Sequence, residues 1–257
     1  MAVEDIMTKK VISVDKNRKL SDAVNLMEKK RISRVAVTTN GELCGILTEK
    51  DVADHVGSVR HGKSMPSSLH ISTAMKSPII SVEKDVSIRE ATKTMLKEGI
   101  SSLPVLSEGK LAGIVTKTDL VKTFADSEEK LEDIMKRGVV TVSPNDRIVH
   151  ARRLMLDKKI GRLVVVEEGN IVGILTERGA AKTLFAFKQA TDKGHALRIR
   201  NIQVKDAMTP KVITLDIKAK AKDAINIMIK NKFSGIPLTR GGKLAGIVTK
   251  TDILRIK

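Results

Sequence analysis

Three threonines that directly follow a Gly-Ile-Leu or Gly-Ile-Val run are each followed, three residues later, by an aspartate. A threonine at the start of a helix with an acid three residues on forms a capping box, in which both side chains satisfy free backbone donors. A carboxylate also accepts two hydroxyl donors well, and a helix N-terminus favours anions. The pattern therefore predicts helix caps, ligand-binding groups, or both. The pairs are Thr48 with Asp51, Thr116 with Asp119, and Thr249 with Asp252.

Residues for other kinds of chemistry do not occur in a working arrangement. The sequence has no His-Glu-x-x-His and no Cys-x-x-Cys motif, and its five histidines are scattered without metal-ligand spacing. It also lacks a Gly-x-Ser-x-Gly nucleophile elbow and a Walker-type phosphate loop. The carboxylate pair Glu167–Glu168 falls at an expected hairpin turn, where solvent surrounds it. We therefore predict no catalytic residue, no metal site and no required cofactor, and we expect a protein that is not an enzyme.

Composition and charge restrict the partners. Apolar residues make up 41% of the chain, yet it has four Phe and no Trp or Tyr, so the core must be aliphatic and rings for stacking on bases are scarce. The net charge of +17 favours nucleotide phosphates, nucleic acid or acidic proteins, although such charge also serves solubility. Cys44 is the only cysteine, which excludes an intrachain disulfide. No signal-peptide pattern and no membrane-spanning run occur, so we expect a cytoplasmic protein with no membrane partner.

Five landmark positions recur in four copies with constant spacing, which indicates an internal repeat. Relative to a first methionine, a second Met follows after 20 residues, glycines after 34 and 38, and a threonine after 41. In order of position, the landmarks are Met7, Met75, Met135 and Met208; Met27, Met95, Met155 and Met228; Gly41, Gly109, Gly169 and Gly242; Gly45, Gly113, Gly173 and Gly246; and Thr48, Thr116, Thr176 and Thr249.

Each copy predicts a strand, a helix, a hairpin and a second helix. A β-branched run such as Val11-Ile12-Ser13-Val14 is typical of a strand. Leu20, Ala23, Val24 and Met27 then form one apolar helical stripe, and Asn40-Gly41 is a strong hairpin signal. The fold class is therefore predicted to be α+β, built from four β-α-β-β-α units.

A unit of this length is marginal as an independent fold, so the copies are expected to pair. The natural division is two pairs, residues 1–126 and 127–257. Within these pairs the four repeats are predicted to cover residues 1–56, 70–126, 127–184 and 202–257.

In the motifs of its repeats the chain resembles tandem cystathionine-β-synthase (CBS) domains, which pair into Bateman modules. One motif that carries the resemblance is Gly-x-x-x-x-Pro, found at residues 99–104, with a near relative at residues 232–237. The other is Gly-Ile-Val-Thr-Lys-Thr-Asp at residues 113–119 and again at 246–252. The resemblance covers nearly the whole chain and implies two Bateman modules in a disc-like pseudo-dimer.

The resemblance also implies what the Thr-x-x-Asp motif does. In this family the Asp holds the ribose hydroxyls of an adenosine ligand, and the preceding strand and the Pro region form an apolar slot for adenine. The implied ribose residues are Thr48, Asp51, Thr116, Asp119, Thr249 and Asp252; the implied slot residues are Ile46, Pro104, Ile114, Pro237 and Ile247. Arg31, Lys159 and Lys232 align five residues before the Pro position and are candidate phosphate contacts.

The four copies differ in these residues. Repeats 2 and 4 carry the full set, whereas repeat 1 has Ala36 where the Pro belongs, which makes its site less complete. Repeat 3 has Gly179 in place of the Asp and Val164 in place of the Pro, so we expect it to be structural or ligand-free.

Three functions are compatible with the sequence. The first is a regulatory sensor that binds AMP, ADP, ATP or S-adenosylmethionine between paired repeats and transmits a conformational change to an unidentified regulated protein; a homodimer is also possible. The second is a nucleic-acid-binding protein that uses the basic segment with Lys193, His195, Arg198 and Arg200. The third is a ligand-free interaction scaffold.

Overall fold

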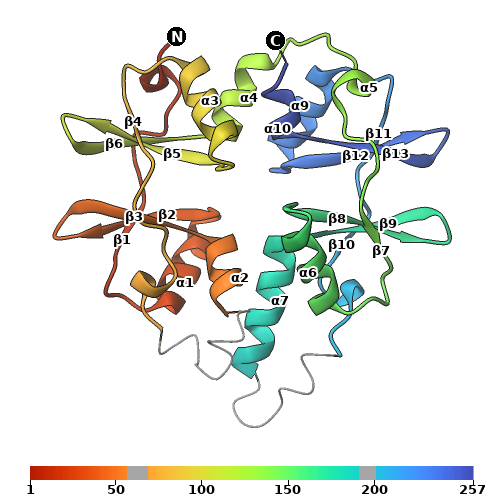
Figure 1. Ribbon diagram of the computed structural model, residues 1–257, viewed down its shortest axis with the longest axis horizontal. Coiled ribbons are helices and arrows are strands. Elements are labelled where there is room, and N and C mark those ends of the chain that lie inside the picture. Colours follow the sequence, from red (N-terminus) through yellow and green to blue (C-terminus); the bar gives the residue numbers. More distant parts are fainter. Residues whose placement is uncertain (57–68, 191–200, 257) are drawn as a thin grey trace.

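The computed structural model describes residues 1–56, 69–190 and 201–256. It contains four small units, each with one helix packed against a short sheet (Figure 1). Repeat 1 contains η1 (Val3–Asp5), β1 (Ser13–Asp15), α1 (Leu20–Lys30), β2 (Arg34–Thr39), β3 (Glu42–Thr48) and α2 (Glu49–Val56). Repeat 2 contains η4 (Ile71–Thr73), β4 (Val82–Glu83), α3 (Ile88–Lys97), β5 (Ser102–Ser107), β6 (Lys110–Thr116), α4 (Lys117–Val121) and η5 (Lys122–Phe124).

The second half of the chain repeats this order. Repeat 3 contains α5 (Leu131–Ile134), β7 (Thr141–Val142), α6 (Ile148–Asp157), β8 (Arg162–Glu167), β9 (Asn170–Thr176) and α7 (Glu177–Ala190). Repeat 4 contains η6 (Val204–Asp206), β10 (Thr209–Pro210), β11 (Leu215–Asp216), α9 (Ala221–Lys230), β12 (Gly235–Arg240), β13 (Lys243–Thr249) and α10 (Lys250–Ile253). The predicted basic segment with Lys193, His195, Arg198 and Arg200 lies outside the described residues.

Every sheet contains the same three-stranded arrangement. The first strand pairs in parallel with the second, and the second forms an antiparallel hairpin with the third. The sheet of repeat 3 gains a fourth strand, because β10 of repeat 4 pairs antiparallel with β9. The predicted apolar helix stripe is confirmed in α1, where Leu20, Ala23 and Met27 are buried. The equivalent methionines of the other repeats are also at most 1% exposed, so they are core residues. The predicted α+β fold of four β-α-β-β-α units is therefore confirmed.

The segment that opens each repeat packs on the other repeat of its pair. Val3 donates its N–H to the carbonyl of Val86 at 2.9 Å, so the start of repeat 1 lies in the core of repeat 2. In return, Ile71 donates its N–H to the carbonyl of Arg18 at 3.0 Å and lies in the core of repeat 1. Repeats 3 and 4 exchange their opening segments in the same way, through Leu131 and Val204. This reciprocal exchange builds two modules.

The exchange explains two of the sequence landmarks together. The opening methionine of one repeat packs on the second glycine of its partner repeat, for example Met135 on Gly246 and Met75 on Gly45. A Cβ added at Gly246 would lie 2.5 Å from Sδ of Met135, and one at Gly45 would lie 2.8 Å from Sδ of Met75. The glycine therefore recurs because a thioether from another repeat occupies the space of its side chain.

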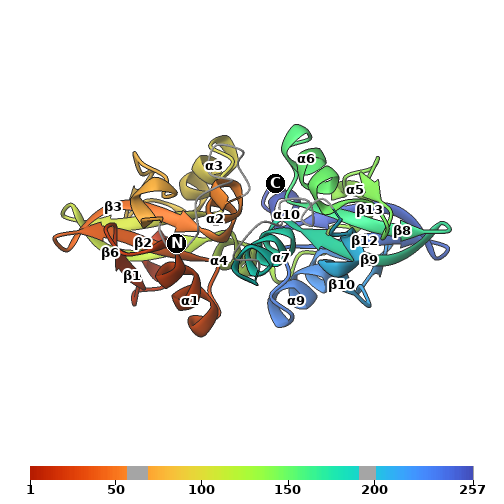
Figure 2. The ribbon, with the colours of Figure 1, turned by 90° about the horizontal axis from the view of Figure 1, so that it is seen from below.

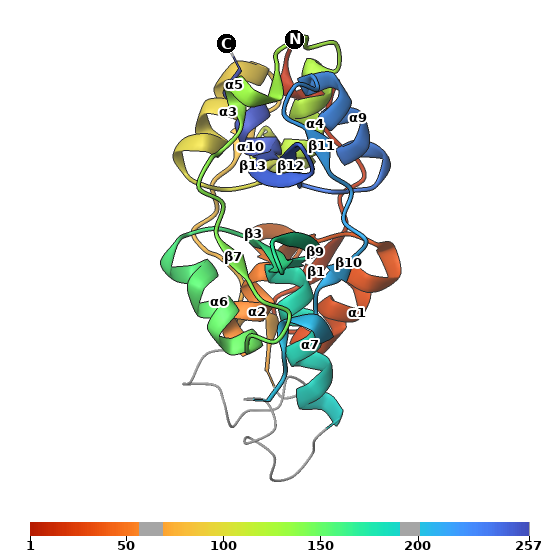
Figure 3. The same ribbon diagram turned by 90° about the vertical axis from the view of Figure 1, so that its right-hand side faces the viewer.

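The two modules lie side by side and make a flat, four-lobed molecule (Figure 1). Figure 2 shows the halves next to each other, and Figure 3 shows the two tiers of each half joined by extended segments. Repeats 2 and 4 share one apolar core that includes Leu120, Ile225 and Ile253, and α4 contacts α10 there. In the other tier α2 of repeat 1 packs on α7 of repeat 3.

Reciprocal ion pairs cross the contact between repeats 1 and 3. Lys50 lies 2.9 Å from Glu177, and Arg178 lies 3.0 Å from Glu49. The two pairs use equivalent positions of α2 and α7, since Glu49 and Glu177 both follow the landmark threonine. The arrangement is therefore a pseudo-twofold one, with like repeats meeting across the disc.

Candidate functional site

The three Thr-x-x-Asp motifs all form the predicted capping box. In repeat 4, Oδ2 of Asp252 accepts a hydrogen bond from the backbone N–H of Thr249 at 2.9 Å and from its hydroxyl at 2.6 Å. The same bonds join Thr116 to Asp119 at 3.0 and 2.7 Å. Thr48 and Asp51 repeat them in the first copy. The cap is therefore real in each case, and it engages only one carboxylate oxygen.

The second carboxylate oxygen meets basic side chains at longer range. Oδ1 of Asp119 lies 3.5 Å from Nζ of Lys122, and Oδ1 of Asp252 lies 3.8 Å from Nζ of Lys136. These distances exceed those of a good hydrogen bond. The side chains of Asp119 and Asp252 are 13% and 3% exposed, so each carboxylate is nearly buried yet keeps an oxygen that can accept hydroxyl donors.

The predicted apolar slot residues lie next to one another. Pro104 faces Ile114 across the hairpin of repeat 2, and Pro237 faces Ile247 in repeat 4. On its other side each isoleucine pairs with the exchanged segment of the partner repeat, as Ile114 does with Thr8. Ile46 occupies the same position opposite Ala36 in repeat 1. The slot is therefore formed by both repeats of a module.

Proline at this position removes a backbone donor. In repeat 1 the N–H of Ala36 donates to the carbonyl of Ile12 at 3.1 Å. Pro104 and Pro237 have no N–H and cannot make that bond to the equivalent carbonyls of Ile80 and Ile213. Ile80 and Ile213 are also 40% and 39% exposed. Repeats 2 and 4 thus each offer an apolar side chain beside a carbonyl that cannot accept a bond from the proline opposite it, a feature that sequence reasoning missed.

Repeat 3 has no room for the missing aspartate. The backbone N–H of Gly179 bonds to the hydroxyl of Thr176 at 3.0 Å, so the helix start is preserved. A Cβ at Gly179 would lie 2.9 Å from the backbone oxygen of Ala207. The prediction that this repeat is structural or ligand-free is consistent with that contact.

Four cationic side chains gather where the four repeats meet. Arg34 and Arg162 open the second strands of repeats 1 and 3, and Lys117 and Lys250 follow the landmark threonines of repeats 2 and 4. Nζ of Lys117 donates to the hydroxyl of Thr251 at 2.9 Å, and Nζ of Lys250 donates to that of Thr118 at 2.8 Å. Each lysine therefore reaches the other module, beside its site aspartate.

The two arginines are held within the protein. Nη2 of Arg162 donates to the hydroxyl of Ser234 in the other repeat of its module at 2.6 Å. Nη1 of Arg34 is buried, and no acceptor lies within hydrogen-bonding distance of it among the described residues. A buried donor without a partner is costly unless a ligand satisfies it. Sequence reasoning missed all four cations, because the repeat spacing does not show that they meet. A signal was present, since Lys117 recurs as Lys250 and Arg34 recurs as Arg162 at equivalent repeat positions.

Burial and mutual repulsion disturb the titration of this cluster. Burial lowers the pKa of Lys250 to about 8, with a further lowering by Arg162, and Asp119 opposes it. Burial likewise lowers the pKa of Lys117 and brings that of Arg162 to about 10. Burial also lowers the pKa of Arg34, against the opposing charge of Asp119. The centre is therefore a strongly positive, partly desolvated site.

The lowered pKa of Lys250 predicts a rise in stability at alkaline pH. In the unfolded chain Lys250 keeps its ordinary pKa of 10.5, so between pH 8 and 10.5 the unfolded state binds more protons than the folded state. The penalty for burying this charge is thus complete below pH 8 and is relieved as the pH rises. Urea unfolding at pH 7.5, 8.5 and 9.5 should show a shallower pH dependence for Lys250→Met than for wild type. The exposed Lys110→Met is the control, and equal slopes for wild type and Lys250→Met would contradict the prediction.

The candidate phosphate contacts occupy turns that follow helices and are not among the four central cations. They are Arg31, Lys159 and Lys232. Each is exposed at the end of a helix, with a left-handed φ of 53°, 53° or 57°. Repeat 2 has Gly99 at the same turn, with φ 65°. Their alignment therefore marks a turn, and their phosphate role stays a prediction.

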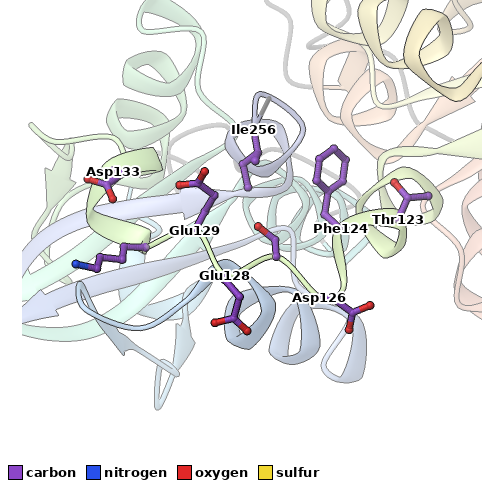
Figure 4. A pocket seen from close by; sticks show the side chains of 9 residues that line it. Thr123, Phe124, Asp126, Glu128, Glu129, Asp133 and Ile256 are labelled. Atoms are coloured by element: carbon purple, nitrogen blue, oxygen red, sulfur yellow. The ribbon is translucent and has the colours of Figure 1, made fainter.

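A hollow of about 670 Å³ lies at the connection between the modules (Figure 4). It is lined by Thr123, Phe124, Asp126, Ser127, Glu128, Glu129, Lys130, Asp133 and Ile256. None of these residues belongs to the predicted site, and the carboxylates that line the hollow disfavour a nucleotide phosphate there. Within residues 1–56, 69–190 and 201–256, no group of three or more His, Cys, Asp or Glu side chains could hold a metal ion. In the same residues no helix is both long and apolar enough to cross a bilayer.

Comparison with known proteins identifies the repeats. The CBS domain profile matches residues 3–58, 70–126, 131–185 and 204–257. The chain is 32% identical over 266 residues to the uncharacterized protein MJ1404 of Methanocaldococcus jannaschii, covering 98% of this chain and 61% of that protein. It is also 32% identical over 263 residues to an uncharacterized 33.4 kDa protein from the ribosomal RNA operon of Thermofilum pendens, covering 94% of this chain and 86% of that one.

A solved structure has the same four-repeat architecture. The crystal structure of protein MJ1225 from M. jannaschii, a candidate archaeal homolog of γ-AMPK, superposes with a TM-score of 0.88 at 26% identity. The match covers 99% of both chains. The predicted resemblance is therefore confirmed along the whole chain, and this protein belongs to the CBS-domain family, with four CBS domains.

Proposed function

We propose that this protein is a regulatory sensor that binds adenine nucleotides, AMP, ADP or ATP, at repeats 2 and 4. The observation that carries the proposal is the group of four cations, Arg34, Lys117, Arg162 and Lys250, that lies beside two caps with a carboxylate oxygen to spare. Asp119 and Asp252 would accept the ribose hydroxyls, and the cations would meet the phosphates. The apolar slots behind them would hold adenine.

The hydrogen-bonding groups at the adenine end of each site favour adenine over guanine. The carbonyls of Ile80 and Ile213 cannot accept a bond from the prolines opposite them, so each can accept one from the 6-amino group of adenine. Guanine has a carbonyl oxygen at that position, which would face another acceptor. Repeat 1 keeps Thr48 and Asp51, but the N–H of Ala36 occupies its carbonyl, so we propose that this third site binds more weakly.

The charge of the centre selects among adenosine ligands. S-adenosylmethionine has no phosphate and carries a positive sulfonium, which four nearby cations would repel. Nucleotides bring the negative charge that these side chains lack. We therefore place S-adenosylmethionine below AMP, ADP and ATP as a ligand.

The site also offers a route for transmission to a partner. Lys117 and Lys250 each donate to a threonine of the other module, so a phosphate that draws these lysines away from the hydroxyls alters the contact between modules. A ligand with different affinity for two poses of the modules would shift their populations. This shift is the conformational signal we propose for the regulated protein.

Isothermal titration of the full chain with AMP, ADP, ATP, S-adenosylmethionine and GMP tests the proposal. The three adenine nucleotides should bind, and S-adenosylmethionine and GMP should bind at least about tenfold more weakly, which corresponds to about 1.4 kcal/mol. Ligand at 100 times its Kd should also stabilise the fold by about 2.7 kcal/mol for each occupied site in urea unfolding. The absence of both heat and stabilisation with every adenosine compound would refute the sensor function.

A further inference from the structure

Within the part of the chain that the structure describes, no cation of the centre forms an ion pair with a carboxylate, whereas the neighbouring carboxylates have other partners. Asp51, Asp119 and Asp252 face Lys76, Lys122 and Lys136, and Glu49 and Glu177 pair with Arg178 and Lys50. Arg255 also lies 3.8 Å from Asp252, the carboxylate that Lys136 already faces. With the five carboxylates each matched once, the excess at the centre is about five positive charges by ordinary protonation states, carried by Arg34, Lys117, Arg162, Lys250 and Arg255.

Both proposed sites share this excess of positive charge. Lys250 of the second module lies at the hydroxyl of Thr118, next to Asp119 in the chain, and Lys117 of the first lies at Thr251, next to Asp252. The positive charges also sense one another, because Arg162 and Arg34 both lower the pKa of Lys250. An anion bound at either site therefore changes the potential at the other.

Resting on the proposed nucleotide function, we propose that the shared charge limits occupancy, so that the protein holds two nucleoside monophosphates but only one triphosphate. A phosphate monoester carries about −1.5 to −2 at neutral pH, so two of them offset most of the excess. A triphosphate adds about one negative charge for each further phosphoryl group, so one molecule alone offsets most of it. A second triphosphate would enter a site with little positive charge left.

With this limit on occupancy, AMP and ATP would produce different states of the protein. With AMP, both modules carry a ligand and both lysines turn to phosphate. With ATP, one site is filled and the other keeps its aspartate and apolar slot without ligand. The two states differ in symmetry about the pseudo-twofold axis, so a partner that docks across both modules would bind them with different affinity.

Calorimetric titration of the full chain at low salt, with EDTA to exclude divalent ions, measures the stoichiometry directly. At the sites of repeats 2 and 4 we expect two AMP, and one ATP with a second ATP weaker by about 5- to 150-fold, the usual range of coupling between sites. Asp51→Asn, which disables the weaker site of repeat 1, should leave these two steps unchanged. Raising NaCl to 0.5 M should bring the two ATP constants together, because salt screens the repulsion. Two ATP of equal affinity at low salt would overturn the inference, while binding of neither nucleotide would instead overturn the sensor function.

Single-site variants distinguish charge from shape as the cause. Asp119→Asn and Asp252→Asn should each bind one AMP and one ATP, because either intact site accepts a triphosphate when the other is not filled. If one variant binds AMP but no ATP, its remaining site excludes triphosphate by shape and the shared-charge inference fails. Lys110→Met removes one positive charge from an exposed residue at the start of β6 that is not one of the cations of the centre, and it should keep the wild-type stoichiometry of both nucleotides.

Discussion

Affinity for AMP should fall about 10- to 100-fold at each site when Asp119 and Asp252 are both replaced by asparagine. Asparagine can still accept the bonds from the threonine at the start of the helix through its one oxygen, so the cap survives. It places an amide NH2 where the second carboxylate oxygen would accept a ribose hydroxyl. Losing a charge-assisted hydrogen bond of about 1.5–3 kcal/mol accounts for the expected change.

A matched control exists for this experiment. Asp223 caps α9 with the same bond, accepting the N–H of Lys220 at 3.0 Å, but it lies away from both proposed sites. Asp223→Asn should therefore leave AMP binding unchanged, as measured by the same titration. Circular dichroism and urea unfolding should show that the double variant is folded. Wild-type AMP affinity in a folded double variant would show that these carboxylates serve only as caps.

The second large effect is on stability, and we expect Gly246→Ala to lower the free energy of unfolding by about 1–3 kcal/mol, as overpacking in a core usually does. The added methyl would lie 2.5 Å from Sδ of Met135 and 3.0 Å from the backbone oxygen of Lys136. The exchanged segment of repeat 3 would have to move away from the sheet of repeat 4. Equilibrium unfolding in urea measures the loss.

A double variant shows whether the contact with methionine is the cause. Met135→Ala removes the thioether that the new methyl would meet, so Gly246→Ala with Met135→Ala should cost less than the sum of the single changes. Gly161→Ala is the control, since the nearest neighbour of its Cβ, Oε2 of Glu177, would lie 3.4 Å away, and its effect should stay within about 0.5 kcal/mol. Strict additivity of the two changes would contradict the proposed packing of exchanged segments.

Much of the local structure could be predicted from the sequence. Helix stripes such as Leu20, Ala23 and Met27 and the caps at Thr116 and Thr249 depend on contacts between residues three to four apart, which spacing reveals directly. The loss of the aspartate at Gly179 was likewise visible in the repeat pattern. The family resemblance extended this to the adenosine site, whose residues stay a prediction until ligand binding is measured.

The sequence by itself determined four copies of one unit, the positions of the three Thr-x-x-Asp helix caps, and the two copies that carry a complete Thr-x-x-Asp and proline set. Only the tertiary structure decided that opening segments exchange between repeats, so that Met135 packs on Gly246, and that Lys117 reaches Thr251 of the other module, 134 residues away. The reason is physical. Residues close in sequence sample one another in any fold of the unit, whereas contacts between repeats depend on which exposed faces pair, and the spacing of the lysines and arginines does not show that they meet.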